Sequence, residues 1–170
     1  MNYKRLFIPN SIVFITAVTH HRKPILISHI ELLRQAFHAA NAKYPFKLMA
    51  FIVNPDHFHI LIKPTDINTY PKIIGIIKRT FTKLLPAEHS LNINREADVW
   101  QRRYWEHIIK NDTDLQKHLD YIHYNSVKHA GIAPKDWPYS SFRKFVEQEW
   151  YELEWYNVDD KNKIATWNME

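Results

Sequence analysis

The sequence of 170 residues contains no cysteine, and it has no apolar run long enough to cross a lipid bilayer. The missing cysteine excludes disulfide bridges, thiolate zinc sites and cysteine nucleophiles. The N-terminus also lacks the pattern of a signal peptide. With 45% hydrophobic residues, the chain is apolar enough and long enough to bury the core of one domain. We therefore expect a cytoplasmic protein without a membrane partner.

Acidic residues are scarce in most of the chain and concentrated near its end. Residues 1–146 hold 21 Lys and Arg against 11 Asp and Glu, whereas residues 147–170 hold 2 against 7. This asymmetry predicts a basic domain at 1–146 and an acidic C-terminal tail at 147–170. A basic domain favours a polyanionic partner, with nucleic acid first, although the same charge could serve solubility alone. The tail is either a disordered appendage or a cover for the basic surface.

Hydrophobic periodicity predicts the order of secondary structure. Strands are expected where β-branched and aromatic residues concentrate, and helices where apolar residues recur at helical spacing. The expected strands are 11–19, 46–53, 57–63 and 99–109, and the expected helices are 28–44, 70–85, 111–131 and 140–150. The order β-α-β-β-α-β is that of an α+β, ferredoxin-like split β-α-β fold, an antiparallel sheet with helices on one face. An extra helix at 111–131 follows the last strand.

His57 and His59 lie two positions apart in the third expected strand, within the stretch VNPDHFHILIKP. Side chains alternate across a strand, so both imidazoles share one face while Phe58 and Ile60 share the other. The apolar face should meet the helices, which leaves the imidazoles on the open face. Two adjacent imidazoles can chelate one divalent cation. The alternative is a pair of partly exposed histidines bonded to neighbouring groups, because His-x-His patterns often bind no metal.

The helix at 111–131 carries a second polar set. Tyr121 and Asn125 are one turn apart and therefore neighbours on one face, and His118 and Lys128 fall on nearly the same side. Two neutral histidines and an Asn carboxamide suit Mg²⁺ or Mn²⁺ and leave positions open for phosphate oxygens. The alternative is that these helix residues simply lie at the surface.

In the metal-site interpretation, Tyr121 would attack phosphorus, and Lys128 would stabilise charge on the phosphate or on the leaving oxygen. This extra helix would then carry the nucleophile. Tyr124 lies about 60° further round the helix and is a second candidate nucleophile. Tyr121 is favoured because it lies one turn from Asn125.

Basic residues elsewhere are candidate DNA contacts. Arg102 and Arg103 stand among Trp and Tyr residues, whose rings can stack on unpaired bases while guanidinium groups meet phosphate. The alternative is that these rings pack in the core and the arginines are solvated. Lys78, Arg79 and Lys83 in the helix at 70–85 are further candidate phosphate contacts.

Three blocks of the sequence together resemble one known family. They are NPDHFHILIKP, VWQRRYWEHIIKNDTDLQKHLDYIHYNSVKHAG and WPYSSF, in that order. In order and spacing they resemble the REP-associated tyrosine transposases, within the HUH single-tyrosine transposase superfamily, whose domain is often labelled transposase-like. The resemblance covers residues from about 11 to 145, so the domain at 1–146 would be the catalytic one.

The resemblance implies roles for four residues. His57 and His59 match the HUH metal ligands, Asn125 matches the third ligand and Tyr121 matches the nucleophile. Proteins of this kind cleave single-stranded DNA near hairpin-forming palindromes, with a divalent metal such as Mg²⁺ or Mn²⁺. Their tyrosine becomes joined to a 5′-phosphate and a 3′-OH is released. The partner would thus be single-stranded DNA with REP-type palindromes, and the protein would act as a monomer or homodimer.

Two positions depart from the pattern of that family. Ser126 stands where Pro is usual after the metal-ligating Asn, and residues 54–56 read Asn-Pro-Asp where Met-Pro-Asn is common. Neither change removes a reactive group. Two other functions stay open, a nucleic-acid-binding regulator without cleavage and a metallohydrolase that uses metal-bound water.

Overall fold

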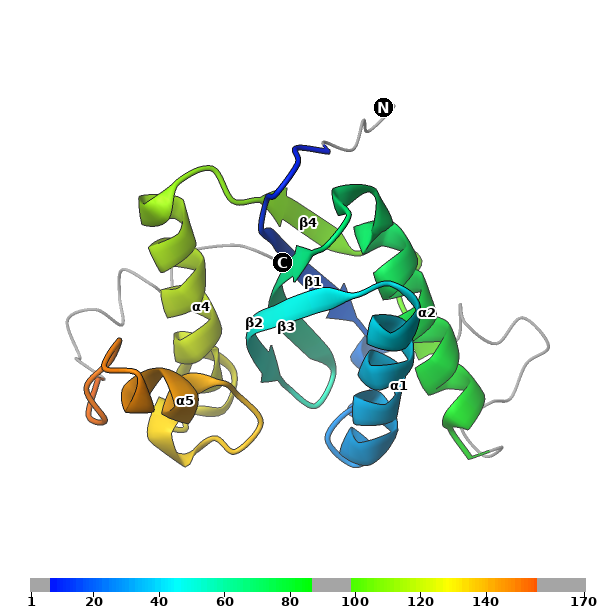
Figure 1. Ribbon diagram of the computed structural model, residues 1–170. Coiled ribbons are helices and arrows are strands. Elements are labelled where there is room, and N and C mark those ends of the chain that lie inside the picture. Colours follow the sequence, from blue (N-terminus) through cyan, green and yellow to red (C-terminus); the bar gives the residue numbers. More distant parts are fainter. Residues whose placement is uncertain (1–6, 87–98, 156–170) are drawn as a thin grey trace.

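The computed structural model describes residues 7–86 and 99–155, and its centre is a four-stranded antiparallel sheet (Figure 1). The strands lie in the order β2-β3-β1-β4, and each neighbouring pair is antiparallel. With a helix after β1 and another after β3, this is the expected ferredoxin-like arrangement, and the predicted fold class is confirmed. The strands are β1 Val13–Val18, β2 Phe46–Val53, β3 His57–Pro64 and β4 Trp105–Ile108.

Helices α1 (Ile30–Lys43) and α2 (Tyr70–Leu84) pack side by side on one face of the sheet, on the right in Figure 1. Alternation along β3 directs Phe58, Ile60 and Ile62 to this face, and none of the three is more than 1% exposed. This layer is the larger hydrophobic core of the described chain. It also includes Val13, Ile15, Ala17, Leu33, Ala36, Ile73, Ile77 and Phe81.

A bulge part-way along strand β2 shifts the alternation of its side chains between the two faces of the sheet. Its pairing with β3 skips a residue between Leu48 and Ala50, as a β-bulge does. Leu48 packs with the α1–α2 core, whereas Ala50 and Ile52 belong to the core on the opposite face. Beyond the bulge, the side chains of Phe51 and Val53 pack on the α1–α2 side of the sheet.

Helix α4 (Asp112–Ala130) covers the other face of the sheet, on the left in Figure 1. Its N-terminus is capped by Asn111, whose side chain accepts a hydrogen bond from the backbone N–H of Asp114. It ends at Gly131, whose φ of 65° favours glycine. The expectation of an open sheet face was therefore wrong. The buried apolar side chains of the sheet that pack toward α4 are Phe14, Ala50, Ile52 and Leu61.

The strand expected at 99–109 is much shorter, because only Trp105–Ile108 forms β4. Trp100 is fully buried, and its indole N–H donates to the backbone carbonyl of Lys78 on α2. It also forms an isolated bridge with Thr19. Since Trp100 is held against α2, the residues between it and β4 form a loop rather than a strand.

The segment after α4 folds back on α4 and β2 through the short helix α5 (Phe142–Glu147). The indole N–H of Trp137 donates to the carbonyl of Val53 at 3.0 Å, and the Tyr151 hydroxyl donates to Asp120 on α4 at 2.8 Å. The packed chain thus continues past residue 146, while positions 156–170 of the predicted tail lie outside the described residues. Short 3-10 turns lie at His20–Arg22, Ile67–Thr69 and Pro134–Asp136. Across the two described stretches, none of the helices is both long and apolar enough to span a membrane.

Candidate active site

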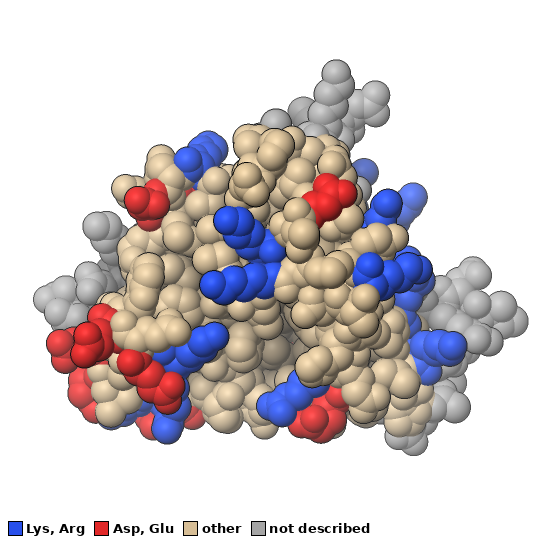
Figure 2. Space-filling model, in the orientation of Figure 1, with Lys and Arg blue, Asp and Glu red and all other residues tan. Residues whose placement is uncertain are grey.

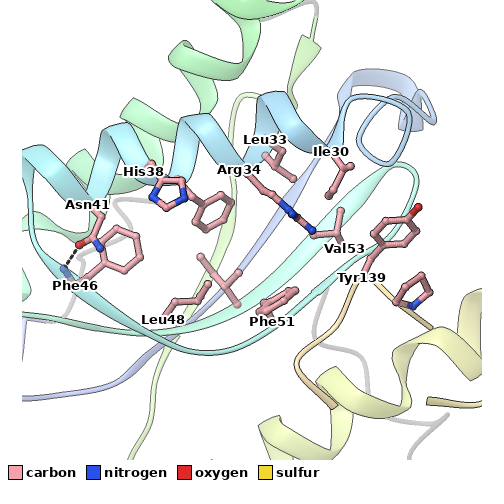
Figure 3. Close-up of a pocket in the computed structure, with 13 residues that line it drawn as sticks. Ile30, Leu33, Arg34, His38, Asn41, Phe46, Leu48, Phe51, Val53 and Tyr139 are labelled. Carbon is pink, nitrogen blue, oxygen red and sulfur yellow. Dashed lines mark hydrogen bonds between the residues drawn. The ribbon is translucent and has the colours of Figure 1, made fainter. Parts of the chain in front are cut away.

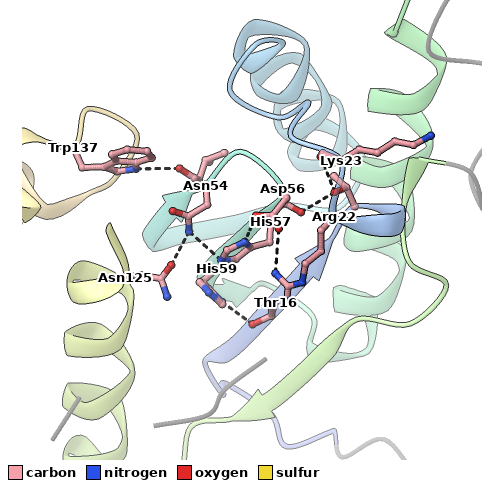
Figure 4. Close-up of polar contacts among 11 residues, drawn as sticks. Thr16, Arg22, Lys23, Asn54, Asp56, His57, His59, Asn125 and Trp137 are labelled. Atoms are coloured by element: carbon pink, nitrogen blue, oxygen red, sulfur yellow. Dashed lines mark hydrogen bonds and ion pairs between the residues drawn. The ribbon is translucent and has the colours of Figure 1, made fainter. Parts of the chain in front are cut away.

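His57 and His59 lie side by side on β3 and face α4 (Figure 4). Their ring centroids are 5.0 Å apart, and the two residues are only 1% and 0% exposed. Imidazoles removed from water need partners for their nitrogens. The hydrogen-bond partners of the two rings determine which nitrogen of each ring is occupied and which is left for a ligand.

Asp56 orients the ring of His57. Nδ1 of His57 lies 2.6 Å from one carboxylate oxygen of Asp56, and the Arg22 guanidinium donates to the other at 3.1 Å. Burial alone would raise the pKa of Asp56, but the hydrogen bonds and charges of His57 and Arg22 outweigh burial and hold this pKa below its usual value. With the proton on Nδ1, His57 presents the lone pair of Nε2, as metal-binding histidines do.

Thr16 on β1 holds His59 in the same manner. The Thr16 hydroxyl lies 2.7 Å from Nδ1 of His59, and these two residues are directly paired across the strands. The ring of Phe14 stacks on the ring of His59, with centroids 5.6 Å apart. Nδ1 of His59 is therefore occupied by the contact with Thr16 on β1, and metal binding by His59 would use Nε2.

Asn125 of α4 is linked to the histidines through Asn54, which precedes the turn between β2 and β3. The side-chain NH₂ of Asn54 donates to Oδ1 of Asn125 at 2.6 Å and to Nε2 of His57 at 3.1 Å (Figure 4). Both asparagines are at most 1% exposed. Oδ1 of Asn54 and Nδ2 of Asn125 are buried without a hydrogen-bond partner among the described residues.

A divalent cation fits the donors gathered here. Two imidazole nitrogens and a carboxamide oxygen suit Mg²⁺ or Mn²⁺. A carboxylate behind His57 and a hydroxyl behind His59 are the outer partners that keep metal-binding histidines in place. Buried amide atoms without partners, as on Asn54 and Asn125, are uncommon and indicate a site that a polar ligand completes. The three predicted ligands therefore lie in one cluster.

Tyr121 lies beside this cluster, one helical turn before Asn125. Its ring packs edge-on against His59 with centroids 5.1 Å apart, and the residue is 1% exposed. The Lys128 ammonium, two turns further along α4, donates to the Tyr121 hydroxyl at 3.3 Å and lies 5.1 Å from the ring centroid. A cation at this distance stabilises negative charge on the phenolic oxygen. Tyr124 is also buried, but the ring in contact with His59 is that of Tyr121.

His118, which the sequence places on nearly the same side of the helix as Tyr121, belongs to a separate cluster where α4 meets β4. Nε2 of His107 lies 2.8 Å from Oδ2 of Asp114, and Nδ1 of His118 lies 2.8 Å from the Asp114 backbone carbonyl. Ligand atoms of these three side chains lie within 4.8 Å of one another, close enough to hold a metal ion. Burial lowers the pKa of His118. Burial alone would raise the pKa of Asp114, but hydrogen bonds from His107 and the Lys110 N–H outweigh it and lower this pKa.

Four of the six predicted phosphate or DNA contacts are exposed, whereas Lys128 is half-buried and Lys78 is buried. Arg102 and Arg103 lie in the loop before β4. Arg79 and Lys83 lie on α2, on the opposite face of the sheet from Tyr121. These two groups of cations therefore do not form one patch around the candidate nucleophile.

Lys78 is placed differently from the prediction. It is 6% exposed, and its ammonium donates to the backbone carbonyls of Gln101 and Arg102 at 2.9 and 3.5 Å. Its charge therefore holds the loop that carries Arg102 against α2 rather than facing solvent. A helical pattern alone does not separate such a buried lysine from its exposed neighbours.

Two lysines that sequence reasoning missed face each other on β2 and β3. Lys47 and Lys63 are directly paired across these strands, and both are exposed. Alternation from His59 places Lys63 on the same face as the histidine pair. Like charges directly opposite each other destabilise a sheet. Figure 2 shows Lys and Arg gathered over the middle of the molecule, between α4 and the α1–α2 pair.

His129 is a third residue that sequence reasoning missed. It lies one turn after Asn125 on α4, and its ring centroid is 4.7 Å from that of His57. The repeat of four residues from Tyr121 through Asn125 to His129 is the sequence signal that places all three on one side of the helix.

A pocket of about 330 Å³ lies on the far side of the sheet, between α1 and β2 (Figure 3). Its lining is mainly apolar, with Arg34 and His38 as its basic groups. Ile60 of β3 contributes to this lining, and its neighbours His57 and His59 point to the opposite face. The sheet therefore separates this pocket from the histidine cluster.

Comparison with known proteins gives consistent similarities. Residues 9–125 match the family described as Transposase IS200 like. The chain is 42% identical to a Haemophilus influenzae protein named as a REP-associated tyrosine transposase, over 91% of this chain and 92% of that one. It is 31% identical to the REP-associated tyrosine transposase of Escherichia coli K12, over 90% and 89% of the two chains. A solved structure of a REP-associated tyrosine transposase bound to a REP hairpin matches with a TM-score of 0.78 and 30% identity, over 92% of each chain.

Proposed function

The chain belongs to the IS200-like transposase family, and on that basis we propose that it breaks and rejoins single-stranded DNA at hairpin-forming palindromes of the REP type. The observation that carries the proposal is the position of Tyr121, packed against His59 with the Lys128 ammonium 3.3 Å from its hydroxyl. The similar structure bound to a REP hairpin supports a hairpin as the substrate of this chain.

Tyr121 is the nucleophile in this proposal. Its oxygen attacks the phosphorus of the scissile phosphodiester, so a bond forms between Tyr121 and the 5′-phosphate while the bond to the 3′-oxygen breaks. The 3′-oxygen leaves as a hydroxyl after taking up a proton, and the Tyr121 hydroxyl gives one up. Lys128 stabilises the negative charge that develops on the phenolic oxygen. Since one phosphodiester is exchanged for another, the step needs no nucleotide cofactor, and attack by a 3′-OH reverses it.

We further propose that His57, His59 and Asn125 hold a divalent cation, Mg²⁺ or Mn²⁺. When bound, the cation supplies electrophilic activation of the scissile phosphate. The contribution of the protein is orientation, because Asp56 and Thr16 keep the two rings turned with Nε2 as the ligating atom.

Exposed cations in the loop before β4 and on the β2–β3 pair are the proposed contacts for the DNA backbone. Arg102 and Arg103 project from the loop before β4, and Lys47 and Lys63 form the like-charged pair on β2 and β3. A phosphate between the two lysines would relieve their repulsion. Such contacts supply affinity without reading sequence.

One chain supplies every group in this proposal. His57 and His59 come from β3, and Tyr121, Asn125 and Lys128 from α4 of the same chain, all in mutual contact directly or through Asn54. We therefore propose that a monomer carries the complete set of reacting groups and can cleave without a partner subunit.

A covalent adduct tests the proposal. The protein is incubated with Mn²⁺ and a labelled single-stranded oligonucleotide that forms a hairpin found next to the gene in its own genome, and the products are separated under denaturing conditions. We expect an adduct with the wild type and with Tyr124→Phe, and none with Tyr121→Phe. Cleavage without an adduct would contradict the proposal and indicate a metallohydrolase. Hairpin binding without cleavage would contradict it in favour of a regulator.

A further inference from the structure

We propose that Asn54 is a fourth protein ligand of the cation site and that it binds through Oδ1 after its side-chain amide turns over. The inference rests on the proposed function, because it completes the ligand set of the same site. Asn54 is the last residue before the Pro55–Asp56 turn, where its backbone N–H donates to the carbonyl of His57 at 2.8 Å. The hairpin therefore fixes the backbone from which this side chain projects.

The Asn54 amide already touches two of the three predicted ligands. Its nitrogen is 2.6 Å from Oδ1 of Asn125 and 3.1 Å from Nε2 of His57. Adjacent ligands of an octahedral cation with bonds of about 2.1 Å lie about 3.0 Å apart. An atom in this position is thus at the separation expected of a third ligand next to both.

Hydrogen bonding explains why nitrogen occupies this position in the structure. Nε2 of His57 and Oδ1 of Asn125 both present lone pairs, and the NH₂ of Asn54 supplies an N–H to each. A cation would engage both lone pairs, and NH₂ would then face a positive charge. Turning the amide by 180° about its Cβ–Cγ bond exchanges nitrogen and oxygen at nearly the same place, because the two ends of the group have almost the same shape.

The two buried amide atoms without partners mark this place as a site for a polar ligand. Oδ1 of Asn54 and Nδ2 of Asn125 each lack a hydrogen-bond partner among the described residues, although both side chains are buried. In the turned orientation, Oδ1 of Asn54 gains the cation as its partner, and its NH₂ group takes the place that Oδ1 held. The orientation is therefore selected by the charge of the cation, which favours an oxygen rather than an NH₂ group beside it.

The consequence is a tighter site with a defined number of open positions. Two imidazole nitrogens and two carboxamide oxygens occupy four positions of an octahedron, which leaves two for phosphate oxygens or water. Asn54 stands where the pattern of the family that the chain resembles commonly has Met, a residue without an oxygen ligand.

Mn²⁺ affinity, measured by titration calorimetry on the DNA-free protein, tests Asn54 without relying on cleavage. Asn54→Leu keeps the approximate volume and removes the oxygen, whereas Asn54→Asp keeps the shape and adds a charged oxygen. Asn68→Leu is the matched control, because Asn68 is exposed on a turn away from the site. Asn125→Leu reports the loss of a ligand that belongs to the proposed metal site. Circular dichroism in EDTA establishes that each variant is folded.

We expect Asn54→Leu to weaken Mn²⁺ binding by about tenfold or more, Asn54→Asp to tighten it, and Asn68→Leu to leave it unchanged. If Asn54→Leu does not fold, the Asp variant decides, and unchanged or weaker binding by it overturns the inference. Tighter binding by Asn54→Leu would also overturn it, because the amide would then compete with the cation. Wild-type protein that binds no Mn²⁺ would overturn both this inference and the proposed metal site. If Asn125→Leu loses affinity and neither Asn54 variant differs from wild type, this inference alone fails.

Discussion

Replacing Lys128 with methionine should slow the formation of the Tyr121–DNA adduct without unfolding α4. The Lys128 side chain is half-buried and runs two turns along α4 to the Tyr121 hydroxyl, where its ammonium donates at 3.3 Å. Methionine keeps the length and the apolar stem and removes only the charge and the donor. The change therefore isolates the electrostatic part of the contact.

The expected size of the effect follows from the chemistry of this contact. A hydrogen bond to a charged group contributes about 1.5–3 kcal/mol. Each 1.4 kcal/mol or so corresponds to a factor of ten in rate. Lys128 is partly exposed and 3.3 Å is a long donor distance, so the lower end of the range applies. We expect the adduct to form about tenfold more slowly.

The assay is single-turnover adduct formation with protein in excess over a labelled hairpin oligonucleotide and with saturating Mn²⁺. Under these conditions the rate reports the step at Tyr121 rather than DNA binding, and a gel-shift titration measures binding separately. Lys117→Met is the matched control, because Lys117 is exposed on the same helix. Lys128→Arg keeps a cation near the hydroxyl and should recover part of the rate.

Equal rates for Lys128→Met and wild type would refute the assignment of Lys128 to the reacting oxygen. A loss of hairpin affinity that accounts for the whole decrease would refute it as well, because Lys128 would then be a DNA contact. A rate decrease of the same size in Lys117→Met would show that any positive charge on α4 supports adduct formation. The rate would then not depend on the contact between Lys128 and Tyr121.

Three further predictions concern the metal, the pH and the DNA surface. His57→Ala, or EDTA with the wild type, should abolish cleavage and leave most hairpin binding in a gel-shift assay, and parallel loss of both would contradict this. The pKa of His118 and that of Asp114 are both lowered in the folded state, so the unfolded chain binds more protons on acidification. The free energy of unfolding should therefore fall first below the ordinary His pKa of 6.5 and then below the ordinary Asp pKa of 3.8. Thermal melts at pH 7.5, 5.5 and 4 measure this, and a melting temperature that rises toward pH 4 would contradict it. Lys47→Glu and Lys63→Glu should each weaken hairpin binding and reduce its salt dependence by about one counterion, and an unchanged salt slope would contradict their contact with phosphate.

Much of the fold follows from local sequence because β-branched, aromatic and apolar residues are concentrated in the central strands. In β3, Phe58, Ile60 and Ile62 alternate with His57, His59 and Leu61, and this period indicates the strand and the face that meets α1 and α2. The bulge between Leu48 and Ala50 in β2 has no such local signal, because its position depends on pairing with β3. The lysine pair was missed for the same reason.

Hydrophobic periodicity alone does not show that α4 covers the histidines, because several of the covered side chains are polar. His118, His123, Asn125 and Ser126 are all buried on α4, although residues of these types usually face water. They are accommodated because partners are present, as when Ser141 lies 2.9 Å from Nε2 of His123. Hydrophobic periodicity predicts that such a polar helix face is exposed to solvent. Two polar surfaces that satisfy each other are recognised only when both sides are known.

The serine at position 126 has a consequence for the nucleophile that the sequence pattern alone does not reveal. A proline there would lack the backbone N–H of an interior helical residue and would collide with the preceding turn, which kinks or ends a helix. With Ser126, α4 continues to Ala130, and the Ser126 hydroxyl donates to the carbonyl of Ile132 as the chain leaves the helix. Tyr121 and Lys128 are seven residues apart, so they share a helix face only if the two turns between them are unbroken. The cation beside the tyrosine hydroxyl in this chain therefore depends on the continuity of α4 through residue 126.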